Sequence, residues 1–301
     1  MLSVALVLGV AGTSFADSTA AKRPAAASID DLSLIPVDSE LVGGLDWAQL
    51  QTSPLWQKHV EPLMRNAMAG LPSDFVTSCG DPAKMMSRLS FGLKGLQGGS
   101  PEGVVVMYGV SKPTMTKCME KGKSTPDAKL TRDGDYFLVS GGGNNAAFTF
   151  LDNTTLLGVI GPQGTKAGVK AVAAGGSALK KSPTFLELYG KTRTSDTLWV
   201  LVNGNSKLFD GAGAGLGMKP KAIFGSLNVG KSLTLDARIR VESSSQASSA
   251  SSLLQSQAGQ LSMFVDKLDI GADGPDVTIS AALSEAKIKM LLGLLGKSRA
   301  P

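Results

Sequence analysis

The chain has 301 residues, of which 43% are hydrophobic and 18% charged, a composition typical of a folded globular protein and not of a disordered one. Its formal net charge of +5 comes from scattered Lys and Arg residues, without the basic cluster that marks a nucleic-acid-binding surface. We therefore expect no nucleic-acid partner, and the length allows one large domain or two small ones.

The N-terminus has the pattern of a secretory signal. Residues 2–12 are apolar and uncharged, and Ser14 and Ala16 place small residues at the cleavage positions before Asp17. This pattern predicts a signal peptide over residues 1–16 and a periplasmic or extracellular protein. No Lys or Arg precedes the apolar run, which leaves open whether the true start lies upstream. No later apolar run is long enough to cross a bilayer, so we expect no integral membrane segment after cleavage.

The mature chain begins with residues 17–35, an Ala- and Ser-rich stretch that predicts a flexible lead-in. A strand ending at Asp46 is expected next, and Ser53-Pro54 then has the N-cap and first-position proline of a helix. We expect Pro62 to kink or split this helix. Its predicted apolar face consists of Leu55, Trp56, Val60, Leu63, Met64 and Ala67.

The only two cysteines flank a predicted hairpin of strands at 89–93 and 104–108, and Cys118 lies on a helix that starts near Lys112. A bond between Cys79 and Cys118 would stabilise the fold by about 4 kcal/mol in the chain-entropy model. Export favours this disulfide over the alternative of two buried free thiols. A redox pair would be expected as C-x-x-C, and two thiols with one distant histidine are too few to hold a metal.

The second half of the chain repeats the order of the first. After Cys118, hairpins are expected at 130–139 and 148–160, and helices at 165–174 and from Ser182. In the second half, strand, hairpin, helix, hairpin and closing helix are expected in the same order, at 198–203, 223–241, 243–264, 267–279 and 288–295. We predict an α+β fold of two tandem copies of an antiparallel-sheet-plus-helices unit, at residues 36–180 and 181–297.

The helix predicted over Ser243–Phe264 is rich in Ser and Gln, and its apolar residues step by three and four positions. We expect Leu254, Leu261 and Val265 to be buried and the serines to be exposed.

Two glycine-rich stretches invite comparison with nucleotide-binding loops. In Gly211–Gly217, Leu216 takes the place of the third glycine of G-x-G-x-x-G, so we expect a mobile loop. Gly161–Lys166 lies between a strand and a helix, a context suited to an anion, but it lacks the Gly-Lys-Ser/Thr of a Walker loop. We expect a simple turn there.

Four acids near the C-terminus suggest a calcium site: Asp266, Asp269, Asp273 and Asp276. Their spacing does not fit an EF-hand loop, and no Glu closes the loop. We expect solvated acids in a hairpin, and we assign no metal and no cofactor.

Candidates for catalysis are few. His59, the only histidine, flanks the apolar face of the helix that contains Pro62, and the chain has no Gly-x-Ser-x-Gly elbow. Asp46, at a strand end, is the best single acid, but its counterpart in the second copy is Asn203. We therefore assign no catalytic residue and interpret His59 as structural.

Two groups of short motifs carry a family resemblance: Ser-Cys-Gly-Asp-Pro at 78–82 with Thr-Lys-Cys at 116–118, and Leu-Leu-Gly-Val-Ile-Gly at 156–161 followed by Ser-Pro-Thr-Phe and Trp-Val-Leu-Val-Asn up to Asn203. In these motifs the chain resembles a group of secreted bacterial proteins of unknown function with duplicated α+β units. The resemblance implies a fold and an extracytoplasmic location, and it brings no catalytic residues.

These observations favour a non-enzymatic cell-envelope protein that binds a partner protein or an apolar ligand along its sheet or helix faces. Two alternatives stay open. One is a hydrolase that uses Asp or Ser groups between the two copies, and the other is a periplasmic carrier of a lipid or another apolar ligand. A closed pocket with acids near Asp46 would favour the hydrolase, and a continuous apolar groove would favour the carrier.

Overall fold

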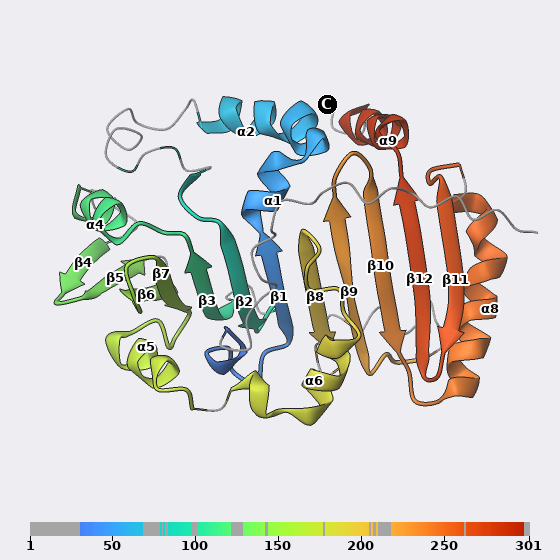
Figure 1. Ribbon diagram of the computed structural model, residues 1–301. Coiled ribbons are helices and arrows are strands. Elements are labelled where there is room, and N and C mark those ends of the chain that lie inside the picture. The colour runs from blue at the N-terminus through green and yellow to red at the C-terminus, as the bar shows by residue number, and fades with distance from the viewer. Residues whose placement is uncertain are drawn as a thin grey trace, which may run out of the picture.

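A single antiparallel sheet of twelve strands organises the molecule (Figure 1). The structure, a computed structural model, describes residues 31–68, 79, 81, 84–97, 101–121, 129–141, 144–176, 178–204, 206, 209, 218–261 and 263–297. The predicted signal peptide and the glycine-rich stretch at 211–217 lie outside the described residues.

The strands run across the sheet in the order β11-β12-β10-β9-β8-β1-β2-β3-β7-β6-β5-β4. In chain order they are β1 (Leu41–Asp46), β2 (Arg88–Lys94), β3 (Glu102–Tyr108), β4 (Lys129–Asp133), β5 (Tyr136–Gly141), β6 (Asn144–Phe150), β7 (Thr155–Ile160), β8 (Leu198–Asn203), β9 (Ala222–Val229), β10 (Leu233–Arg240), β11 (Lys267–Asp273) and β12 (Asp276–Leu283). The described helices are α1 (Trp47–Thr52), α2 (Glu61–Met68), α4 (Lys112–Lys121), α5 (Lys166–Ala173), α6 (Pro183–Gly190), α8 (Ser244–Leu261) and α9 (Glu285–Lys297), with short turns η1 (Asp31–Ser33), η2 (Trp56–Val60) and η4 (Leu179–Lys181).

The predicted α+β class and antiparallel sheet are confirmed, but the sheet is continuous. Strand β1 pairs with β8 at the centre, from Leu41 opposite Val202 to Leu45 opposite Leu198. Pairing satisfies the backbone groups that two separate sheets would leave open at these edges. On one side of this pair the hairpin β9–β10 follows, and then the hairpin β11–β12. On the other side β2–β3 is followed by β6–β7 and by an extra hairpin, β4–β5. This topology does not by itself establish a duplication, so the two tandem copies stay a prediction.

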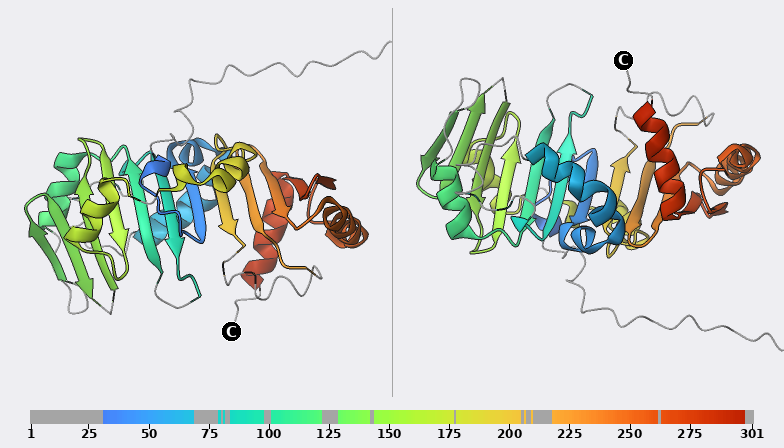
Figure 2. Two further views of the ribbon diagram at one scale, coloured as in Figure 1. Left: turned by 90° about the horizontal axis from the view of Figure 1, so that it is seen from below. Right: turned by 90° about the horizontal axis from the view of Figure 1, so that it is seen from above.

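One face of the sheet, called the front face, is the face on which α5 and α6 pack (Figure 2). Phe185 and Leu188 of α6 join Trp199 and Phe224 of the sheet in the central core. A Cβ at Gly44 would lie 2.3 Å from the indole nitrogen of Trp199, so glycine is needed there for the ring to fit. A second cluster on this face joins β3, β6 and β7 to Val169 of α5.

The N-terminal segment joins the front core earlier than expected. The predicted lead-in runs to residue 35, yet Leu32 and Ile35 are both 0% exposed. Asp31 is also fully buried and accepts hydrogen bonds from Ser90 and Tyr108. The packed part of the chain therefore includes the last residues of that stretch.

The helix predicted from Ser53-Pro54 contains the π-helical turn η2 and continues as α2, in which Pro62 is the second residue, so the expected kink or split at Pro62 stays a prediction. Its apolar face is only partly buried. Leu55 and Trp56 are buried, but Val60 is 38% and Leu63 66% exposed. The predicted face is thus buried at its first two residues and open to solvent at Val60 and Leu63, and the side chains of Met64 and Ala67 lie outside the described part.

Helix α8 packs on the other face of the sheet, called the back face, over β10, β11 and β12. It ends at Leu261, three residues before the predicted end. Leu254 packs against the cluster around Ala247 and Ala250, and Val265 is half-buried beyond the helix. Ser251 is 6% exposed, which corrects the expectation that the serines all face solvent.

The structure contains a disulfide between Cys79 and Cys118, whose Cα atoms are 4.5 Å apart. Both residues are buried, Cys118 on α4. The bond ties the segment before β2 to the helix after β3.

Candidate functional site

The acid and amide singled out in the sequence take ordinary roles. Asp46 is the N-cap of α1, and its carboxylate accepts a hydrogen bond of 2.7 Å from the backbone N–H of Gln49. This use of a strand-end aspartate satisfies an otherwise unpaired helix donor. Asn203 ends β8 and lines a small crevice on the front face.

His59 lies on η2 and its Nε2 is 3.2 Å from the Glu285 carboxylate of α9. Lys58 and Lys289 pair with the same carboxylate at 2.5 and 3.3 Å. The hydrogen bond with Lys58 is the largest of the effects that lower the pKa of Glu285 to about 2. His59 thus helps to join η2 to the C-terminal helix.

The four C-terminal acids do not converge on one point. Asp266 accepts from the backbone N–H of Ser284, and Asp269 pairs with Lys267 at 2.9 Å. Asp273 and Asp276 pair with arginines of β10. The part of the chain that the structure describes holds no group of three or more His, Cys, Asp or Glu side chains placed to bind a metal.

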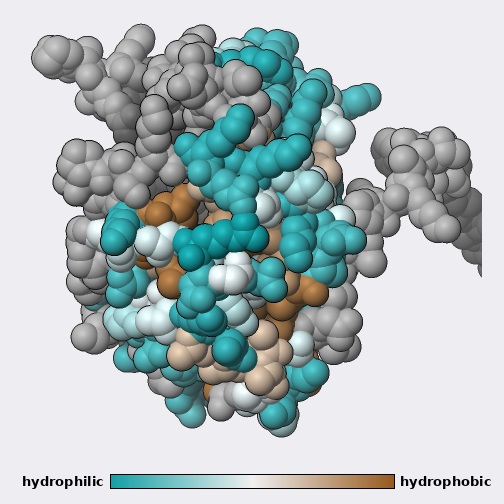
Figure 3. Space-filling model, turned by 90° about the vertical axis from the view of Figure 1, so that its left-hand side faces the viewer, coloured by the Kyte–Doolittle hydropathy of each residue, from teal (hydrophilic) through white to brown (hydrophobic). Residues whose placement is uncertain are grey.

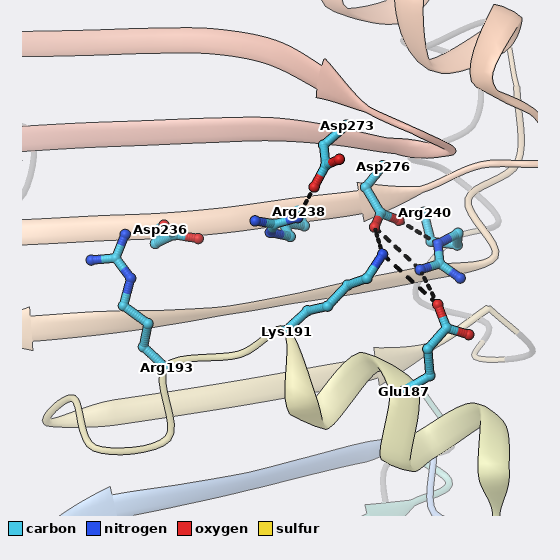
Figure 4. Close-up of polar contacts among 8 residues, drawn as sticks. All are labelled: Glu187, Lys191, Arg193, Asp236, Arg238, Arg240, Asp273 and Asp276. Atoms are coloured by element: carbon cyan, nitrogen blue, oxygen red, sulfur yellow. Dashed lines mark hydrogen bonds and ion pairs between the residues drawn. The ribbon is translucent and has the colours of Figure 1, made fainter.

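The densest group of charges lies on the front face, where α6 meets β10 and β12 (Figure 4). We call it the ion-pair ladder. It contains four cations and four anions: Lys191, Arg193, Arg238 and Arg240, with Glu187, Asp236, Asp273 and Asp276. The cations and anions are equal in number, so the ladder as a whole carries no net charge.

The centre of the ladder is Asp276, whose side chain is 0% exposed. Lys191 approaches it at 2.8 Å, and Arg240 binds both of its carboxylate oxygens. Burial raises the pKa of Asp276, but the hydrogen bonds from Arg240 and Lys191 outweigh it and leave the pKa below its usual value. Glu187 completes the group at 2.8 Å from Arg240, which lowers the pKa of Glu187.

The ladder follows from strand periodicity. Asp236, Arg238 and Arg240 alternate along β10 and so point to one face of the sheet. Asp276 is directly opposite Arg240 across the β10–β12 pair. The alternation in LTLDARIR could have revealed this row of charges, but the partners on α6 come from a segment far away in sequence. Because its members satisfy one another, the ladder docks α6 on the sheet and offers no reactive group.

Three cavities that open to solvent are lined by described residues. One of about 210 Å³ lies beside the disulfide and is lined by Cys79, Met85 and Met115. The other two, of about 270 and 90 Å³, lie between α6 and the strand ends on the front face. Asp46 lines none of the three.

The back face of the central strands carries large apolar side chains that the fold does not bury. On the front face, Val42, Trp199 and Phe224 are at most 2% exposed. On the back face of the same strands the side chains are only half-buried: Leu41, Leu45, Leu89, Phe91, Leu198, Val200, Val202 and Leu227. Leu235, opposite Leu227 on β10, is 37% exposed. By contrast, the end of the molecule at β4 is mostly hydrophilic, with small separate apolar patches (Figure 3).

These features define an α+β protein built on one twelve-stranded antiparallel sheet. Among solved structures, the fold is similar to that of TP0453 from Treponema pallidum. Crystal form I of TP0453 aligns with a TM-score of 0.52 and 8% identity over 89% of this chain and 98% of that one. Crystal form III gives a TM-score of 0.53 and 7% identity over 87% and 96%. At these identities the likeness is one of fold.

No family model matches the sequence, and no curated protein does. The resemblance to a sequence family that the short motifs predicted is therefore not supported. What the comparisons support is a structural similarity to TP0453. None of the described helices combines the length and the apolarity needed to cross a membrane.

Proposed function

We propose that this chain is a non-enzymatic protein of the cell envelope that binds an apolar surface of a partner on the back face of its sheet. The observation that carries the proposal is the row of half-buried apolar side chains on that face, which reaches Leu235 at 37% exposure. Monomeric soluble proteins rarely expose large contiguous apolar patches, and those that occur mark binding surfaces.

Three observations support an envelope location. The N-terminus has a secretory pattern, the fold holds a disulfide, and disulfides persist in oxidising compartments. The fold is also like that of TP0453, an envelope-associated bacterial protein. Cleavage before Asp17 is part of this proposal.

The two alternatives have less support. A hydrolase would need acids gathered around Asp46, whose carboxylate instead caps α1. A lipid carrier would need an enclosed apolar groove, whereas the two adjoining front-face cavities, of about 270 and 90 Å³, open to solvent and are partly lined by charged residues. A broad, open apolar face favours contact with another large surface.

The test is a pull-down of envelope proteins with the mature chain as bait. Leu235→Lys should abolish retention of the partner, because it places a charge in the apolar face. Thr234→Lys, one residue earlier on β10 and on the front face, is the matched control and should retain it. Equal retention by both variants, with both folded by circular dichroism, would refute the proposal.

A further inference from the structure

A cleft on the front face, apart from the back-face surface, has the chemistry of a ligand site. The cavities of about 270 and 90 Å³ share Thr184, Leu188, Lys221 and Ala222 in their walls. They are thus an outer and an inner part of one cleft, between the first turn of α6 and the ends of β8, β9 and β10.

The outer part is lined by two cations, Arg240 and Lys221, and by one acid, Glu242. Arg240 lines it with a side chain that is 15% exposed. Its Nε and Nη2 are held by Asp276 and Glu187, whereas Nη1 makes no hydrogen bond to the part of the chain that the structure describes. Lys221 lines the same wall and pairs only at the surface with Glu242, at 2.6 Å, where both side chains are more than half exposed. An exposed pair of this kind is weak and can be exchanged for a ligand anion.

The inner part has an apolar floor, and its walls also carry the polar residues Ser39, Ser182, Thr184 and Asn203. Val42, Phe185 and Leu201 are at most 5% exposed and form its floor. Its volume of about 90 Å³ limits it to a short aliphatic group. Val37 lies at its rim and is 42% exposed.

We propose that this cleft binds a carboxylate that carries a short aliphatic group. The carboxylate pairs with Lys221 and Arg240 in the outer part, in place of Glu242, and the aliphatic group enters the inner part. Two sources share this chemistry: a free short-chain acid, and the C-terminal carboxylate of a peptide that ends in a small aliphatic residue.

Titration calorimetry of the mature chain with acetate, butyrate and octanoate tests the fit. Affinity should rise about fourfold for each methylene from acetate to butyrate and then level off, because the inner part is full. Butylammonium, which has a similar shape and the opposite charge, should not bind. The dipeptide N-acetyl-Gly-Val separates the sources: tighter binding than butyrate assigns a peptide terminus, and weaker binding assigns a free acid. Absence of binding by both butyrate and the dipeptide at 0.1 M salt would overturn the proposal.

Four surface variants test the residues. Glu242→Gln removes the competing carboxylate and should tighten butyrate binding about two- to fivefold, and Lys221→Gln should weaken it by a similar factor. Lys231→Gln, an exposed lysine in the β9–β10 turn, makes the same charge change elsewhere and should leave affinity unchanged. Val37→Asp should weaken butyrate more than acetate. Equal affinities for Lys221→Gln and Lys231→Gln would contradict the assignment.

Discussion

At the scale of single residues, Asp276 has the most direct role in holding the fold together. It is fully buried, and two cations from different parts of the chain, Lys191 and Arg240, hold its charge. A buried charge is tolerated only when it is paired, and removal of one partner leaves the others uncompensated. Asp276 therefore fixes the position of α6 on β10 and β12.

Asp276→Asn should lower the free energy of unfolding by about 3 kcal/mol, at the low end of the range for a buried pair because Lys191 stays one-third exposed. Asp269→Asn is the matched control, since its pair with Lys267 lies at the surface, and it should change stability by less than about 0.5 kcal/mol. Urea denaturation at neutral pH measures both. Equal effects would mean that the ladder does not stabilise α6.

The ion pairs of Asp276 also predict that the stability of the fold depends on pH. The pKa of Asp276 is lower in the folded chain than in the unfolded one, where a value of about 3.9 applies. Its contribution to stability is thus fully present above about pH 4 and is lost as the pH falls through the lower folded value. The stability difference between wild type and Asp276→Asn should be constant from about pH 5 to 7 and shrink below about pH 4. A difference that grows on acidification would contradict the sign of the shift.

Part of this site could be predicted from residue patterns, although the row of charges on β10 was not. The period-2 order of β10 places three charges on one face, and β2 predicts Leu89, Phe91 and Leu93 on the other. Which face the core covers cannot be deduced from alternation. In β2 the small residues Ser90 and Gly92 face the front core, because Asp31 and Ile35 of the N-terminal segment pack there. That long-range contact has no local sequence signal.

At the scale of elements, α8 was predicted closely from its three- and four-residue steps, and its polar face looks away from the sheet. Its buried side is narrow: Ala247 and Ala250 allow close approach to β10 and β12, and Leu254 continues the same face. Helix α2 has an equally clear apolar stripe, yet Leu63 is 66% exposed. Periodicity thus identifies the apolar side of a helix, whereas burial of that side depends on whether the helix packs against the sheet.

Leu254→Asp should lower the free energy of unfolding by about 2–4 kcal/mol, because it places an unpaired charge against the apolar cluster under α8. Leu253→Asp makes the same change one position away, where the side chain is 42% exposed, and should be nearly neutral. Thermal unfolding of the two variants checks the orientation of the helix. A larger loss for Leu253→Asp would place the wrong face on the sheet.

At the scale of the whole molecule, two predicted units form one sheet because β1 and β8 pair at its centre. The outer strands are protected in different ways. At one edge Gln255 of α8 donates to the backbone carbonyl of Ile270 on β11, and at the other Arg132 of β4 pairs with Glu120. Charged or covered edges discourage growth of the sheet by strand addition. Protected edges support the proposal that a partner binds on the back face of the central strands and not by strand addition.

The most direct test of that claim is site-specific photo-cross-linking in intact cells. A photoreactive phenylalanine analogue is placed at Leu235 or Leu227 on the back face, and at Thr234 on the front face. The back-face positions should give the same partner adduct, and Thr234 should give none, because neighbouring residues of a strand point to opposite faces. Equal adducts from Thr234 and Leu235, or an adduct from Thr234 alone, would contradict the assignment of the back face as the binding surface.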